Sequence, residues 1–140
     1  MEVANFEEKL FPRDGGAVWT GMGNYCLVSP DKERRVILAY VGEPAHGDSY
    51  HQISIDGRAF PGYAWGCMFA FSPESRYLAF SWMAALIQRK TAVADVVERR
   101  YFVLPDYIHD FRFNWPLISG QNKSKGHSYE FTGEEKWVSY

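Results

Sequence analysis

The fold is decided by residues 71–80, Phe71-Ser72-Pro73-Glu74-Ser75-Arg76-Tyr77-Leu78-Ala79-Phe80. An aromatic residue ends one apolar run, a Ser-Pro-acidic-small sequence follows, and a second apolar run begins after Arg76. Proline presets its own φ, and the polar residues that follow it favour a tight turn. The stretch therefore predicts two antiparallel β-strands joined by a turn at Pro73.

The same arrangement recurs along the chain, because 43 residues separate Pro30 from Pro73 and Pro73 from Pro116. Around Pro30, the apolar residues before the proline match those of the second copy, but the polar turn after it reads as longer. Pro116 opens a third, more degraded copy. A repeat of about 40–50 residues is typical of one four-stranded propeller blade. We therefore expect an all-β protein built from tandem blade-like antiparallel sheets.

Residues 71–80 resemble the blade motif of WD40-like and TolB-type β-propellers, whose usual form is Phe-Ser-Pro-Asp-Gly-Arg-Tyr-Leu-Ala-Phe. Val93-Ala94-Asp95-Val96-Val97 is similar to the strand that follows in such a blade. The resemblance implies two blade-like repeats, at about residues 25–71 and 69–116, within a single domain of residues 1–140. Propellers close with about four to eight blades, so we expect an incomplete propeller or a sandwich-like arrangement.

The ends of the chain and one internal segment carry weaker signals. Phe6 and Leu10 lie four residues apart, a spacing that also suits a short N-terminal helix. Residues 129–140 suggest a closing hairpin around residues 132–134. Residues 83–90 favour helix by propensity, but their place in the repeat predicts a strand end followed by a loop. The inward strand positions of the second copy predict five core residues: Phe69, Phe71, Leu78, Phe80 and Val93.

Composition excludes several classes of protein. The net charge of −2 gives no field that would attract nucleic acid or an anionic membrane. Basic pairs such as Arg34-Arg35 and Arg99-Arg100 are interleaved with acidic residues, which suits solvated faces. Residues 1–14 contain no apolar stretch, and no apolar run of the sequence is long enough to span a membrane, so we expect neither a signal peptide nor a membrane-spanning segment. We therefore expect a cytoplasmic protein in which Cys26 and Cys67 are reduced, buried thiols.

One segment carries residue types that can bind metals. His46, Asp48 and His51 offer two imidazoles and a carboxylate. Their spacing fits no metal site that we can defend, so we expect solvated loop residues. Cys67 is also a poor candidate for a catalytic nucleophile, because it lies in an apolar run, where a buried thiol is inert. The sequence thus predicts neither a metal nor a cofactor.

A second segment carries residue types used in acid–base catalysis. Asp106 and Asp110 flank His109 in the sequence and could raise its pKa, which is a general-base arrangement in principle. Adjacent residues of a strand point to opposite faces, so His109 and Asp110 would not pair if they lie on a strand. We expect a structural or surface role for this segment.

Aromatic residues make up 17% of the chain, and tryptophan, tyrosine and arginine concentrate at the centres of protein interfaces. We expect a non-catalytic protein-binding protein, most concretely a bacterial immunity protein that occludes a cognate toxin, by analogy with small, mildly acidic domains. The alternatives are a small hydrolase with a site near Asp106, His109 and Asp110, and a subunit that completes a propeller by self-assembly as a homo-oligomer. Binding residues collect on segments between strands, which predicts these contact residues: Tyr107, His109, Asp110, Glu43, His46 and Asp48.

Overall fold

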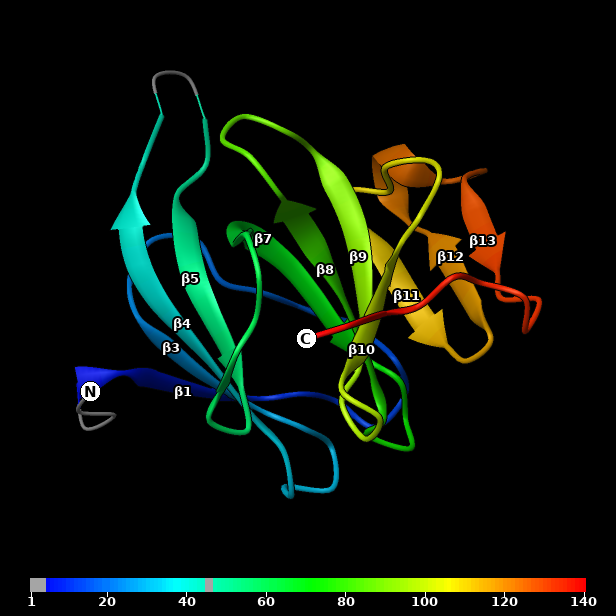
Figure 1. The fold of residues 1–140 in the computed structure, drawn as a ribbon, viewed down its shortest axis with the longest axis horizontal. Helices are drawn as coiled ribbons and strands as arrows, with labels where there is room; N and C mark the ends of the chain where they lie inside the picture. The colour runs from blue at the N-terminus through cyan, green and yellow to red at the C-terminus, as the bar shows by residue number, and fades with distance from the viewer. Residues whose placement is uncertain (1–4, 45–46) are drawn as a thin grey trace.

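The computed structural model describes residues 5–44 and 47–140, and these are almost entirely β-strands and connecting loops (Figure 1). Within the described residues, the strands form one 11-stranded sheet and one 3-stranded sheet. The all-β prediction is confirmed, with antiparallel sheets and no closed barrel among the described strands.

The two copies of the repeat form two antiparallel meanders of four strands each. The first meander consists of β3 (Tyr25–Val28), β4 (Arg35–Gly42), β5 (Tyr50–Ile55) and β6 (Arg58–Ala59). The second meander consists of β7 (Tyr63–Phe71), β8 (Tyr77–Met83), β9 (Lys90–Asp95) and β10 (Arg100–Val103). The meanders belong to one continuous sheet, because β5 pairs with β7 through Tyr50–Trp65 and His51–Ala64.

The turns at Pro30 and Pro73 have equivalent backbone structures. The Ser29 N–H donates to the Arg34 carbonyl (3.1 Å), and the Ser72 N–H donates to the Tyr77 carbonyl (2.8 Å), so both hydrogen bonds span the same number of residues. The second residue after each proline has a left-handed backbone: φ is 67° at Lys32 and 62° at Ser75. The expectation of a longer turn at Pro30 is therefore wrong. Lys32 adopts the left-handed conformation in that turn as Ser75 does in the other, and the two turns have the same length.

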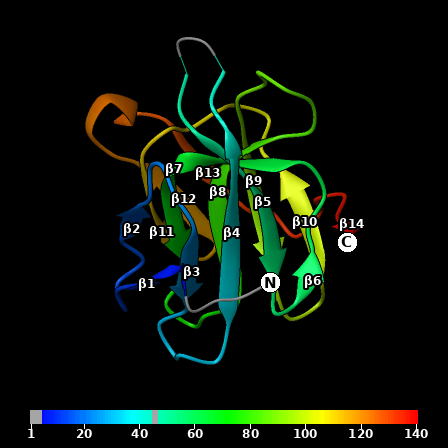
Figure 2. The same ribbon diagram turned by 90° about the vertical axis from the view of Figure 1, so that its left-hand side faces the viewer.

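The molecule has three layers, which lie from left to right in Figure 1: the first meander, the second meander and a third layer. The third layer is the 3-stranded sheet of β11 (Phe111–Asn114), β12 (Leu117–Gly120) and β13 (Ser128–Glu130). Figure 2 shows the first meander face on, with β4 nearest the viewer. The second meander is thus covered on both faces, and every residue of β8 is buried.

Each interface between layers holds a hydrophobic core. The first core, between the two meanders, contains Leu27, Leu38, Ile53, Phe69, Phe71, Leu78 and Phe80, among others. The second core, between the second meander and the third layer, contains Ala79, Val93, Phe111, Phe113 and Ile118, among others. All five predicted core residues are fully buried. Val93 belongs to the second core and the other four to the first, so they lie on opposite faces of the second meander.

The N-terminal segment and the C-terminal segment differ from the expectations. Instead of a helix, β1 (Glu7–Leu10) forms a strand that pairs in parallel with β3. The expected closing hairpin does not form, because β13 pairs with β12 while β14 (Val138–Ser139) pairs with β10. Between β13 and β14 the chain turns at residues 132–135, where the Glu135 carboxylate accepts hydrogen bonds from the Thr132 and Gly133 N–H groups. The loop expected after Met83 is confirmed, since β8 ends at that residue.

Candidate functional site

Three connections between strands gather at one end of the molecule, at the top of Figure 1. They are the described parts of the β4–β5 loop, the β8–β9 loop of residues 84–89, and the β10–β11 connection of residues 104–110. We define the loop-end surface as six residues of these connections: Asp48, Leu86, Ile87, Arg89, Tyr107 and His109. Three of these residues, Asp48, Tyr107 and His109, are contact residues predicted from the sequence. The other three, Leu86, Ile87 and Arg89, had no predicted role.

Arg89 joins the β4–β5 loop to the β8–β9 loop. Its Nη1 lies 2.8 Å from Asp48 Oδ2, and its guanidinium lies 3.8 Å from the centre of the Trp65 ring. Trp65 itself is buried, so the guanidinium covers the indole. The Asp48 side chain is 46% exposed, and such a pair contributes about 0–1 kcal/mol to stability. The pair therefore orients two loops while leaving charged groups accessible to a partner.

Tyr107 links the surface to the interior. Its hydroxyl shares a hydrogen bond of 3.0 Å with Ser81 Oγ, which is fully buried, and another of 3.1 Å with Nδ1 of the exposed His109. Burial raises the pKa of Tyr107, so the phenol stays protonated at neutral pH. Two predicted contact residues, Tyr107 and His109, are therefore held together by a direct hydrogen bond.

Leu86 and Ile87 form the apolar part of the loop-end surface. Their exposed fractions are 57% and 74%. The loop is held on both sides, because Gln88 Oε1 accepts two backbone N–H groups at the start of the loop and the Gln88 carbonyl accepts the Trp65 indole N–H at 2.7 Å. Ile87 has a φ of 77°, which is an outlier for a β-branched residue. The loop thus presents an exposed apolar residue in a strained backbone conformation.

An apolar hollow of about 120 Å³ lies beside Leu86 and Ile87. It is lined by Glu43, Pro44, Tyr50, Trp65, Met83, Leu86 and Ile87. Glu43, a predicted contact residue, accepts a hydrogen bond of 3.0 Å from the Tyr40 hydroxyl. The hollow is large enough for one apolar side chain of a partner, with a carboxylate at its edge.

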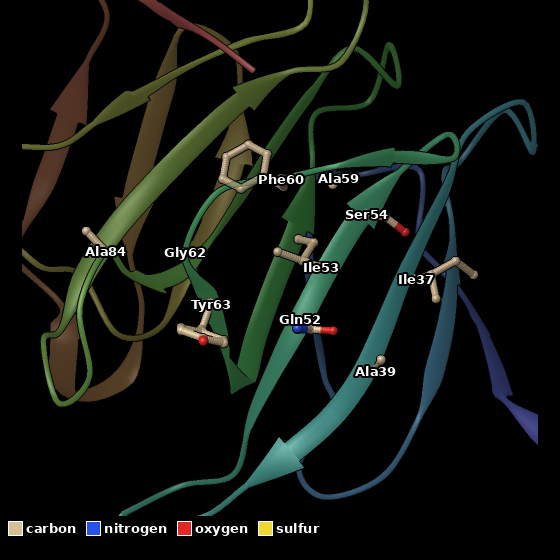
Figure 3. Close-up of a pocket in the computed structure, with 10 residues that line it drawn as sticks. All are labelled: Ile37, Ala39, Gln52, Ile53, Ser54, Ala59, Phe60, Gly62, Tyr63 and Ala84. Carbon is tan, nitrogen blue, oxygen red and sulfur yellow. The ribbon is translucent and has the colours of Figure 1, made fainter. Parts of the chain in front are cut away.

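A larger groove of about 510 Å³ crosses the outward side of β4 and β5 (Figure 3). Its opposite wall is formed by five residues: Ala59, Phe60, Gly62, Tyr63 and Ala84. The polar side chains that line it are Gln52, Ser54 and Tyr63. The Tyr63 ring packs edge to face on Tyr50 at 5.4 Å, so the groove adjoins the apolar hollow. A surface of this composition suits binding better than acid–base chemistry.

The three residues of the predicted acid–base segment do not converge. Asp110 Oδ2 accepts a hydrogen bond of 2.6 Å from Asn122, and the Asp110 N–H donates to Ser124 Oγ. Asp106 lines a separate hollow of about 210 Å³ that does not include His109. His109 faces the Tyr107 hydroxyl instead. Asp110 therefore braces the turn that follows β12 and lies outside the loop-end surface.

The three residues of the segment that carries metal-binding residue types are not brought together among the described residues. His46 lies outside the described residues, and Asp48 pairs with Arg89. His51 is fully buried, contrary to the expectation of a solvated loop residue, because strand alternation on β5 turns it inward with Ile53 and Ile55. Across residues 5–44 and 47–140, no group of three or more histidine, cysteine or acidic side chains could hold a metal ion.

Lowering the pH below about 6.5 should destabilise the protein through His51. Its Nε2 bonds the Gly23 carbonyl at 2.8 Å, and its Nδ1 has no hydrogen-bond partner among the described residues. Burial lowers its pKa from the ordinary value of 6.5, so the unfolded chain takes up a proton that the folded chain does not. Stability should then fall with decreasing pH by up to about 1.4 kcal/mol per unit.

Urea denaturation between pH 7.5 and 5 measures this slope. His51→Gln should flatten it, because a glutamine side chain does not titrate. The exposed His127 provides the matched control, and His127→Gln should leave the slope as in the wild type. An unchanged slope in His51→Gln would show that other groups govern the acid sensitivity.

Both cysteines are free and buried. Burial raises the pKa of the Cys67 thiol, and the protonated thiol is a poor nucleophile. The expectation of two buried thiols is confirmed.

The comparisons with known proteins leave the family open. The chain matches no known protein family, no curated protein and no solved structure. Among the residues that the structure describes, no helix is long and apolar enough to cross a membrane.

Proposed function

We propose that this protein binds another protein through the loop-end surface and catalyses no reaction. The observation that carries the proposal is Ile87, which is 74% exposed and has a φ of 77°. A β-branched residue in this region costs about 1–3 kcal/mol of strain, and its exposed side chain returns little of that through packing. Strain of this kind collects at functional sites. Leu86, the apolar hollow and the Asp48–Arg89 pair supply the apolar centre and charged rim of an interface.

The more specific version of the proposal is a bacterial immunity protein that occludes a cognate toxin in the cytoplasm. Its support is analogy with other small, mildly acidic, aromatic-rich domains without a catalytic motif. The stacked meanders with equivalent Ser-Pro turns support a relation to propeller blades. A subunit that completes a propeller by self-assembly remains an alternative, and a symmetric dimer or higher oligomer in solution would favour it.

The hydrolase alternative would place the general base at His109. A base of this kind is usually oriented by a carboxylate, whereas His109 is bonded to Tyr107. This alternative predicts turnover of an ester, phosphate or glycoside substrate that is lost in His109→Ala.

Replacing both apolar residues of the loop, in the double variant Leu86→Ser with Ile87→Gly, should weaken binding of the partner by about 2 kcal/mol or more. The partner is first isolated with the tagged wild-type protein, identified by mass spectrometry and then titrated in purified form. Stability should stay unchanged or rise by up to about 1 kcal/mol, because glycine adopts a positive φ without strain.

Leu10→Ser is the matched control, since Leu10 is 54% exposed and lies on β1. It should bind the partner as tightly as the wild type does. Equal binding by the double variant and the wild type would show that the partner uses another surface. Loss of binding together with a lowered melting temperature would show that the loop acts through the fold.

A further inference from the structure

A polar groove of about 290 Å³ lies at the end of the molecule opposite to the loop-end surface. Its walls are the β5–β6 turn at Asp56-Gly57 and the β9–β10 turn of residues 96–99, both at the bottom of Figure 1. Arg34 from the β3–β4 turn and Tyr140 complete the lining. The groove is therefore formed by turns of both meanders.

Three arginine side chains and one acidic side chain, that of Asp56, line this groove. Arg34 Nη1 lies 3.0 Å from Asp56 Oδ2, and Asp56 Oδ1 accepts the Arg35 N–H at 2.9 Å. Both oxygens of Asp56 are thus engaged at the Arg34 side. Arg58 and Arg99 are exposed, and neither forms an ion pair with an acidic side chain of the described residues. The groove carries an excess of positive charge in a protein whose net charge is −2.

The backbone holds two of these arginines in place. Arg58 Nε donates to the main-chain oxygen of Tyr140 at 2.8 Å, which leaves the two terminal amino groups of Arg58 free to bind a ligand. The Arg99 carbonyl accepts the Tyr140 N–H at 3.1 Å, and Arg99 itself has a φ of 55°. A left-handed conformation is unfavourable for arginine. The sequence nevertheless has an arginine, Arg99, at this position of the β9–β10 turn.

We propose that Arg34, Arg58 and Arg99 form a binding site for a phosphate group. Guanidinium groups bind phosphate through paired, charge-assisted hydrogen bonds. Arginines from three separate segments suit a tetrahedral anion, which has oxygens in several directions, better than a planar carboxylate. The volume admits a phosphate with a small organic group attached, so both free phosphate and a phosphate monoester fit. The site is independent of the loop-end surface.

Calorimetric titration with inorganic phosphate and with phenyl phosphate at constant ionic strength tests the proposal. In the double variant Arg58→Gln with Arg99→Gln, the dissociation constant for each probe should rise at least tenfold. The control, Arg13→Gln with Arg112→Gln, removes the same charge from exposed arginines elsewhere. It should change the dissociation constant for each probe less than twofold. The double variant Leu86→Ser with Ile87→Gly should bind phosphate as the wild type does. Binding of only one probe would tell a free-phosphate site from a monoester site.

Three results would overturn the proposal. The first is the absence of saturable heat from the wild type up to about 10 mM phosphate, a conservative ceiling for a site of about 1 mM affinity. The second is an equal loss of affinity in the two arginine variants, which would indicate a general charge effect. The third is competition by acetate as strong as that by phosphate, which would show that the groove does not select a tetrahedral anion. Melting temperatures of both variants establish that any loss arises in a folded protein.

Discussion

Replacing Leu78 by alanine will lower the free energy of unfolding by about 2–5 kcal/mol. Leu78 is fully buried in the first core, where its strand neighbours Phe71 and Ala94 are also fully buried. Phe69 and Phe80 stack nearby with ring centres 5.7 Å apart. Neighbours packed in this way relax little, so the substitution leaves a cavity and loses the dispersion contacts of the removed atoms. Chemical denaturation of the purified variant measures the loss.

Leu86→Ala is the matched control, because the same atoms are removed from a side chain that is 57% exposed. We expect it to change stability by less than about 0.5 kcal/mol. If Leu78→Ala cost no more than this control, Leu78 would not be packed in the first core as the structure places it.

Replacing Asp95 by asparagine will cost about 2 kcal/mol. The Asp95 side chain has no exposed surface, and its carboxylate lies 3.0 Å from both Arg76 Nη2 and Arg100 Nε. It also accepts the Val97 and Glu98 N–H groups at 3.2 Å. Breaking a buried ion pair costs about 3–5 kcal/mol. The expected cost is smaller here because both arginines are about one third exposed and regain hydration.

The same carboxylate makes a pH-dependent contribution. Burial by itself would raise the pKa of Asp95, but the hydrogen bonds from Arg76, the Glu98 backbone and Arg100 outweigh it and hold the pKa below the ordinary 3.8. Its stabilising contribution is therefore complete above about pH 4 and is lost as the pH falls below that value. Asp95→Asn should flatten the stability curve in this acid range.

Asp48→Asn is the control for charge removal, since Asp48 is 46% exposed and pairs with one arginine. We expect a loss of at most about 1 kcal/mol. Equal losses in the two variants would mean that Asp95 is better hydrated than its burial indicates.

The repeat could be predicted from the sequence because its signals are local. Ser72-Pro73 and Ser29-Pro30 specify their turns through residues that are adjacent in the chain, and the structure places both turns in equivalent positions. The packing of Val93 could not be predicted in the same way. Val93 was correctly predicted to be buried, but it packs against the third layer in the second core, and strand alternation alone does not indicate which face of β9 that layer covers.

The candidate site was predicted only in part for a similar reason. Asp48 and Tyr107 were named from their place on loops, but the Asp48–Arg89 pair joins residues 41 positions apart, and no local pattern signals such a contact. The left-handed backbone of Ile87 could not be predicted from the sequence, because β-branched residues rarely adopt this conformation. His51 could have been assigned once the inward face of β5 was known, since it alternates with Ile53 and Ile55.

The first core has a consequence for how the chain folds. It draws side chains from both meanders, and the turns of the two copies are also joined, because the Asp31 N–H donates to Ser75 Oγ at 3.0 Å. If the chain were cut between residues 60 and 63 and the two parts separated, each copy of the repeat would expose to water the apolar face that it buries in the first core. The second half would keep the second core, but the first half would keep no core of its own, so the unit that recurs in the sequence is smaller than the unit that unfolds cooperatively.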